Sequence, residues 1–253
     1  MTKQHVKGFS IFKSLLLLGL SSNFLFAKTI DFSVDEDGTP FVNGQSIASP
    51  DEFGIDVSVS TNVGNLGAAI FDTDPTGPNQ GSVGQDDLLV GLGNALIIQH
   101  QNYPTQTTPG IFDQPVDATT GGIFNFDFTN ASTMISIDFI DLDGNAGANV
   151  LMTDTNGLSR NYSIPDQWTN DVREMPNGYA TLDLTTLADQ AGETANLATA
   201  SEDAGFDASS VTRLEVTLFG SGAIDNLVYV PEPGSQEMVA ILLLVFAWAV
   251  RRR

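Results

Sequence analysis

The stretch GIFNFDFTNASTMISIDFID, residues 122–141, decides the fold. In its first half every second residue is a phenylalanine: Phe124, Phe126 and Phe128. Its second half repeats this spacing with Ile135, Ile137 and Phe139. Alternating apolar and polar residues predict β-strands with one buried face, because successive side chains on a strand point to opposite sides. We therefore predict two strands, 122–129 and 133–141, joined as a hairpin by the short connection at 130–132.

Short alternating runs of this kind recur through the body of the chain, separated by Gly, Asn, Asp and Pro. Further strands are predicted at 30–34, 55–60, 68–71, 95–99, 149–154, 158–164, 179–185, 211–219 and 223–230. Asn156-Gly157 predicts a hairpin turn, whereas 187–204 is predicted as a loop with at most a short helix. Many strands without long crossover helices predict an all-β fold, namely a single antiparallel β-sandwich or jelly-roll-like domain spanning 28–229.

The chain is acidic and free of cysteine. Its 31 acidic and 10 basic residues give a formal charge of −21. Such a surface repels phosphate backbones, so nucleic acid is a poor partner and divalent cations are good ones, although acidity also simply keeps a protein soluble. Because there are no cysteines, disulfides, thiol nucleophiles and thiolate metal sites are excluded.

Residues 1–27 have the layout of a secretory signal peptide. Three lysines precede an apolar run at 15–20, and the segment ends in the small residue Ala27. A basic start, a short apolar core and a small residue before the cut are the features that the export machinery recognises. We therefore expect export through the secretion machinery.

The C-terminal segment 230–253 combines a proline-bracketed glutamate, an apolar run and three arginines. The 13 apolar residues from Met238 to Val250 would span about 20 Å as a helix, whereas a bilayer core is about 30 Å thick. This predicts a hydrophobic anchor helix suited to transient membrane contact, with the arginines on the cytoplasmic side.

Val-Pro-Glu-Pro, a hydrophobic helix and terminal arginines in this order resemble the PEP-CTERM sorting signal of Gram-negative bacteria. The residues that carry the resemblance are Pro231, Glu232, Pro233, Arg251, Arg252 and Arg253. The resemblance implies recognition by an exosortase, processing near the Pro-Glu-Pro motif, and release to the cell surface or the extracellular matrix. These residues would then be a motif that the processing enzyme recognises, rather than an active site.

A second resemblance covers FDTDPTGPNQGSVGQDDLLVGLGNALIIQHQN, residues 71–102, together with the strands predicted after it. This part of the chain is similar to a group of uncharacterised secreted bacterial β-sandwich domains, many of which carry PEP-CTERM signals. The resemblance implies the fold and brings no activity with it.

Carboxylates gather in one predicted loop. Asp72, Asp74, Asp86 and Asp87 lie there among glycines and prolines, and Asp225 of the last predicted strand is a further candidate ligand. Calcium takes six to eight oxygen ligands, which a flexible acidic loop can supply, so we predict a Ca²⁺ site. The alternative is that these aspartates only form turns by bonding their own backbone.

No catalytic constellation is recognisable. His100 follows an apolar strand and is interpreted as a strand-end polar residue, while Tyr103 and Trp168 could either stack on sugar rings or pack in the core. The leading hypothesis is a non-catalytic, calcium-stabilised β-sandwich that binds extracellular polysaccharide or builds matrix. The alternative is a secreted glycan-active enzyme that uses paired carboxylates, which the sequence cannot select among 31 acids.

Overall fold

The computed structural model of the chain describes residues 26–35, 37–47, 53, 57–61, 66–82, 85–142, 147–169 and 178–232. Residues 1–25 of the predicted signal peptide (1–27) and residues 233–253 of the predicted C-terminal sorting segment (230–253) lie outside the described residues. Within the described ranges, no helix is long and apolar enough to cross a membrane.

The described chain is all-β and antiparallel, as predicted. Its one helical element is the short 3₁₀ helix η1 (Asp86–Leu88). The strands are β1 (Lys28–Ile30), β2 (Ser46–Ile47), β3 (Val57–Thr61), β4 (Ala68–Asp72), β5 (Asn94–Ile98), β6 (Gly122–Ile140), β7 (Ala148–Asp154), β8 (Ser159–Ile164), β9 (Tyr179–Asp183), β10 (Gln190–Ala191), β11 (Leu197–Glu202), β12 (Val211–Leu218) and β13 (Ala223–Pro231).

The stretch that decides the fold forms one strand of 19 residues, β6, so the predicted hairpin at 130–132 is wrong. The alternation itself is confirmed, because Phe124, Phe126 and Phe128 are all buried. A tight two-residue hairpin turn needs residues with positive φ, and none of residues 130–132 has one. The chain instead stays extended, with Ser132 paired to Val211 of β12.

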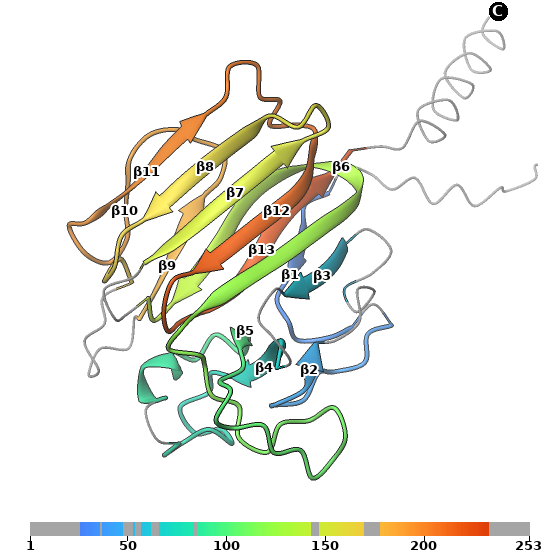
Figure 1. The fold of residues 1–253 in the computed structure, drawn as a ribbon, viewed down its shortest axis with the longest axis vertical. Coiled ribbons are helices and arrows are strands. Elements are labelled where there is room, and N and C mark those ends of the chain that lie inside the picture. The colour runs from blue at the N-terminus through green and yellow to red at the C-terminus, as the bar shows by residue number, and fades with distance from the viewer. Residues whose placement is uncertain are drawn as a thin grey trace, which may run out of the picture.

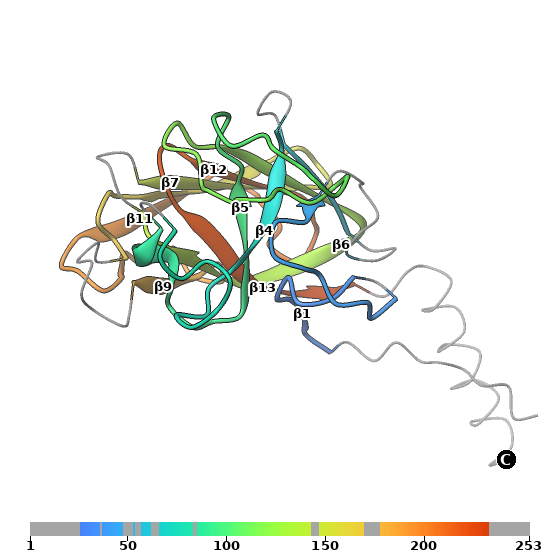
Figure 2. The ribbon, with the colours of Figure 1, turned by 90° about the horizontal axis from the view of Figure 1, so that it is seen from below.

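Because β6 is so long, it changes neighbours along its length. Its first half pairs with β3 and β12, and its second half pairs with β9 and β13 (Figure 1). One side of the sheet then continues through β7, β8, β11 and β10, and the other through β5, β4 and β2. In Figure 2 the half that contains β7 and β12 lies above the half that contains β9 and β13. β6 is therefore the strand that joins the two halves.

The two halves enclose one main hydrophobic core. It takes buried side chains from both, including Phe126, Val150, Leu214, Leu182, Ile224 and Leu227. Full burial of each such side chain contributes roughly 1.5–3 kcal/mol. A smaller cluster around Phe71, Ile97 and Phe112 covers the opposite face of β4 and β5. These two strands are thus buried on both faces, which explains why their sequences are continuously apolar rather than alternating.

Segment 187–204 contains strands β10 and β11, so its prediction as a loop or short helix is wrong. β11 pairs with β8, and only one of its side chains, Ala198, is buried. Beyond Ala198, where the pairing with the two-residue strand β10 ends, β11 is an outer strand that is held by backbone pairing with β8. Such a strand needs little apolar surface, so its sequence lacks the apolar alternation of the other strands. The Asn156-Gly157 turn is confirmed between β7 and β8, with Gly157 at φ +79°.

Candidate functional site

Asp72 and Asp74 lie together in the loop that follows β4. Oδ1 of Asp72 accepts a hydrogen bond from the backbone N–H of Asp74 at 2.9 Å. Oδ1 of Asp74 accepts bonds from the backbone N–H and the hydroxyl of Thr76, both at 2.8 Å. These bonds, the backbone one first, lower the pKa of Asp74. Both aspartates therefore act as turn formers, the alternative that the sequence left open.

Two asparagines fix the same loop. Nδ2 of the buried Asn79 donates to the carbonyl oxygen of Asp72 at 2.8 Å and to Oδ1 of Asn43 at 2.9 Å. Asn43 in turn accepts the backbone N–H of Asp72 at 3.0 Å. The loop after β4 is thus held to the chain before β2 by side-chain amides.

The five aspartates of the predicted calcium site do not form one group. Asp86 is exposed and Asp87 is half-buried on η1, while Asp225 lies on β13. Within the described part of the chain, no group of three or more Asp, Glu or His side chains is placed to hold a metal ion. Calcium at this site stays a prediction, with fewer carboxylates brought together than the sequence suggested.

Asp225 has a different neighbour, which the sequence did not indicate. It pairs across the sheet with Asp138 of β6, and the two residues are 1% and 7% exposed. Nδ2 of Asn226 lies between them, 2.9 Å from Oδ2 of Asp138 and 3.2 Å from Oδ2 of Asp225. We call Asp138 and Asp225 the carboxylate pair. Finding it required the register of two strands 87 positions apart, which no local pattern contains.

The environment of the carboxylate pair disfavours two negative charges. Burial raises the pKa of Asp225 to about 8; the N–H of Asn226 opposes this rise, and the charges of Asp138 and Asp31 add to it. Thr181 on β9 donates its hydroxyl to Oδ1 of Asp138 at 2.5 Å. At neutral pH Asp225 therefore retains its proton unless a cation replaces it. The pair is also too buried to contact a polymeric substrate as catalytic acids would.

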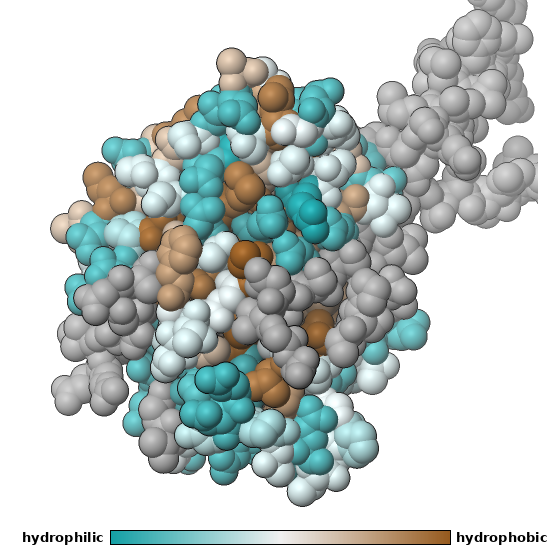
Figure 3. Space-filling model, viewed as in Figure 1, coloured by the Kyte–Doolittle hydropathy of each residue, from teal (hydrophilic) through white to brown (hydrophobic). Residues whose placement is uncertain are grey.

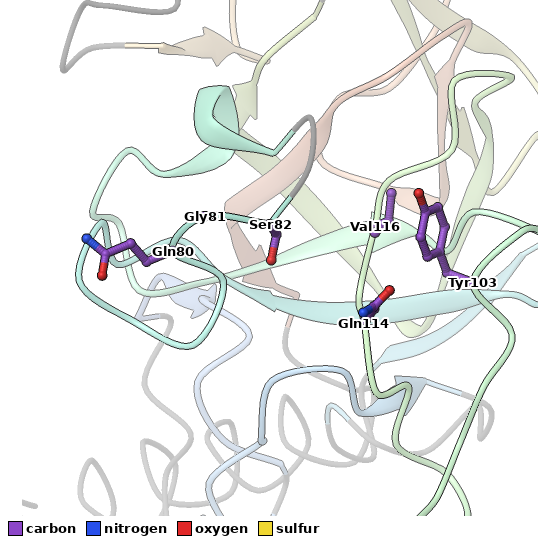
Figure 4. Close-up of a pocket in the computed structure, with 6 residues that line it drawn as sticks. All are labelled: Gln80, Gly81, Ser82, Tyr103, Gln114 and Val116. Atoms are coloured by element: carbon purple, nitrogen blue, oxygen red, sulfur yellow. The ribbon is translucent and has the colours of Figure 1, made fainter.

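Two adjoining hollows lie among the loops beside β4 and β5. The first has a volume of about 260 Å³ and is lined by Gln80, Gly81, Ser82, Tyr103, Gln114 and Val116 (Figure 4). The second has a volume of about 410 Å³ and is lined by Asn102, Tyr103, Thr105, Asp113 and Gln114. The two hollows adjoin at Tyr103 and Gln114, which line both, and we call them together the Tyr103 groove.

A buried glutamine positions one wall of the Tyr103 groove. Nε2 of Gln99, which is 1% exposed, donates to the carbonyl oxygens of Tyr103 at 2.9 Å and Gln114 at 3.0 Å. Its Oε1 accepts the N–H of Val116 at 3.2 Å. One side chain at the end of β5 thus fixes three groove residues.

The facing wall is attached by a second buried pair. Gln85 and Asp117 exchange two hydrogen bonds, Nε2 to Oδ1 at 3.0 Å and the N–H of Asp117 to Oε1 at 3.2 Å. The other carboxylate oxygen of Asp117 accepts the hydroxyl of Ser221 and, at 2.7 Å, the N–H of Gly222. The groove loops are therefore attached to the start of β13.

Tyr103 and Trp168, the two candidate aromatic residues, differ in their exposure to solvent. Tyr103 is half-buried, and its ring meets His100 edge to face with centroids 5.6 Å apart. Trp168 is fully buried, donates Nε1–H to the carbonyl oxygen of Gln190 at 3.2 Å and packs against Phe139. Of the two alternatives that the sequence left open for Trp168, the structure therefore supports packing in the core and not stacking on sugar rings, because its side chain is buried.

The predicted sorting motif, Pro231 to Pro233, begins where the described chain ends. Pro231 is the last residue of β13, and the N–H of Glu232 donates to the carbonyl oxygen of Ala131 at 2.8 Å. Pro233 and the arginines Arg251, Arg252 and Arg253 lie outside the described residues. In comparisons with known proteins, no family model matches this chain and no curated protein matches it significantly.

Proposed function

We propose that this chain is an exported surface or extracellular-matrix protein whose β-sandwich domain binds polysaccharide without cleaving it. The observation that carries this proposal is the Tyr103 groove. It joins a half-exposed aromatic ring to amide and hydroxyl side chains on a wall fixed by Gln99.

These groups match the chemistry of a sugar. A pyranose ring has an apolar face that stacks on an aromatic ring, and its hydroxyls both donate and accept hydrogen bonds. Asn and Gln side chains likewise offer donors and acceptors, so they suit such hydroxyls. A ring and amides fixed in advance bind at a smaller entropic cost than mobile ones. Ligand sites in general combine such a surface with a few placed polar groups.

The test is binding of the purified chain to a panel of soluble polysaccharides. We expect Tyr103→Ala to weaken binding by at least tenfold and Tyr103→Phe to retain most of it, because stacking needs the ring and not the hydroxyl. The same incubations are examined for new reducing ends. Their appearance would favour the glycan-active enzyme instead, and equal binding by the Ala variant would remove the groove from the proposal.

We also propose that calcium stabilises the domain, with Asp225 as a ligand and Asp138 beside it. Two carboxylates fit the preference of calcium for oxygen, and backbone carbonyls and water would complete its six to eight ligands. A divalent cation would remove the unfavourable charge on the buried pair. The loop aspartates Asp72, Asp74, Asp86 and Asp87 are the alternative ligands.

Thermal melting with calcium and with chelator tests this proposal. Calcium at about 100 times its Kd should add about 2.7 kcal/mol, which raises the Tm by roughly 5–10 °C in a domain of this size. Asp225→Asn should abolish the rise, whereas the exposed Asp86→Asn should leave it intact. The reverse pattern would place the ion in the loop, and identical curves with calcium and chelator would remove it.

The route to the surface is proposed from the two ends of the chain. The N-terminal segment would direct export, and the C-terminal segment would hold the protein transiently in the inner membrane until an exosortase acts on Pro231, Glu232 and Pro233. Mass analysis of the mature protein, in cells with and without exosortase, tests this proposal. An unchanged C-terminus in both would contradict it.

A further inference from the structure

Building on the proposed function, we infer that the Tyr103 groove selects uncharged glycan chains and discriminates against polymers that carry carboxylate or sulfate groups. The inference deepens the proposal by naming the class of polysaccharide. It follows from the side chains that line the groove and from where the basic residues lie.

Among the described residues, the lining of the groove contains no cationic side chain that could pair with an anion. Its charged lining residue is Asp113, whose Oδ1 accepts the N–H of Thr107 at 3.0 Å and its hydroxyl at 2.7 Å. The neighbouring His100 accepts the N–H of Asn102 through Nδ1 at 3.0 Å.

The basic side chains of the described residues lie elsewhere. Arg160 on β8 is paired with Glu202 at 2.8 Å and stacks over Phe206. Arg213 on β12 is paired with Asp127 at 3.1 Å. The third, Lys28, lies on β1, which pairs with the far end of β13. None of the three lines the groove.

The electrostatic field of the acidic chain as a whole also disfavours polyanions. A chain of formal charge −21 repels a polyanion before contact, and the repulsion is screened only beyond about 8–10 Å at moderate salt. An uncharged glycan experiences no such repulsion. Its hydroxyls find donors and acceptors together in the amides of Asn102, Gln80 and Gln114, whereas a carboxylate only accepts and is best held by cationic donors.

Binding of the purified full chain to matched polymers tests the inference. The probes are a neutral glucan, a polyuronate of similar length and a chitosan oligosaccharide, at low and at high salt. We expect the glucan to bind at least tenfold more tightly than the polyuronate at low salt, with a smaller ratio at high salt. Glucan affinity itself should not change with salt.

Substitutions inside and outside the groove distinguish a failure of charge selectivity from a failure of glycan binding itself. Asp113→Asn should bring the polyuronate closer to the glucan by a few fold, because it removes the negative charge from the groove. The exposed Asp189→Asn, which lies outside the groove, should leave both affinities unchanged. Tyr103→Ala should weaken glucan binding, whereas Phe219→Ala should not, since Phe219 is an aromatic residue 53% exposed outside the groove.

Each outcome has one meaning. A polyuronate that binds as tightly as the glucan, or chitosan that binds tenfold more tightly, would overturn the uncharged class and leave glycan binding in place. If no polymer binds in a manner that depends on Tyr103, the proposed function itself fails.

Discussion

Two regions of this domain, the strands from β6 to β13 and the loops around β4 and β5, differ in what fixes their geometry. The strands from β6 to β13 pack alternate apolar side chains into one core, and Figure 3 shows hydrophobic residues only scattered among hydrophilic ones on the surface viewed there. The loops around β4 and β5 also rely on buried polar side chains, namely Gln85, Gln99 and Asp117. Apolar packing is insensitive to direction, whereas buried hydrogen bonds fix geometry. The loop region is therefore the part suited to holding a binding site.

The largest effect should come from the apolar region. Phe126 is fully buried between the two halves of the sheet, so Phe126→Ala should lower the free energy of unfolding by about 3–5 kcal/mol. Denaturant unfolding measures the loss, and hydrogen exchange should show it spread over the whole domain. If protection from hydrogen exchange were lost in the groove loops alone, the strand region and the loop region would not unfold as one cooperative unit.

A smaller but more local effect is expected from the polar region. Asp117→Ala removes the acceptor for Gln85, Ser221 and Gly222 and leaves buried donors without a partner, at a cost of about 1–3 kcal/mol. We expect faster hydrogen exchange in residues 80–118, little change in β7 and β8, and weaker glycan binding. The exposed Asp189→Asn, which lies outside the groove, is the control, and equal effects from both would contradict the positioning role of Asp117.

The smallest effect concerns pH and the turn after β7. Burial tends to raise the pKa of Asp154, but the backbone N–H groups of Asp207, Leu158 and Asn156 outweigh it and lower the pKa. A lowered pKa in the folded state contributes stability above the unfolded value of about 4, and this contribution is lost as pH falls through the folded value.

Melting curves below about pH 4 check this expectation. The Tm of the native chain should fall more steeply on acidification than the Tm of the Asp154→Asn variant, because the variant has no carboxylate to protonate at this position. Parallel slopes for the two proteins would show that Asp154 does not contribute.

The strands could be predicted from the sequence because their information is local. Alternation around Phe124 and Leu214 places each side chain without knowledge of its partner. The continuity of β6 could not be predicted, since it depends on the pairing of Ser132 with Val211. The burial of Trp168 depends similarly on Gly192, whose missing side chain leaves room for the indole ring.

The candidate site was predicted less well than the fold. Tyr103 was identified by its type and its place beside a proline, but its supports Gln85, Gln99 and Asp117 are ordinary polar residues in the sequence. The carboxylate pair was half identified, because Asp225 was named without Asp138. Both gaps have the same cause: hydrogen bonds between distant segments leave no periodic trace along the chain.

The position of β13 has a consequence for when the domain can fold. Of the strands that the structure describes, β13 is the last to be synthesised, yet it lies inside the sheet, paired with β6 on one side and with β1 and β5 on the other. Until residue 231 has emerged, β5 and β1 lack the partner that connects them to β6, and the contacts still to be made are distant in sequence and slow to form. The connection of β1 and β5 to the rest of the sheet therefore forms late, only after β13 has been synthesised.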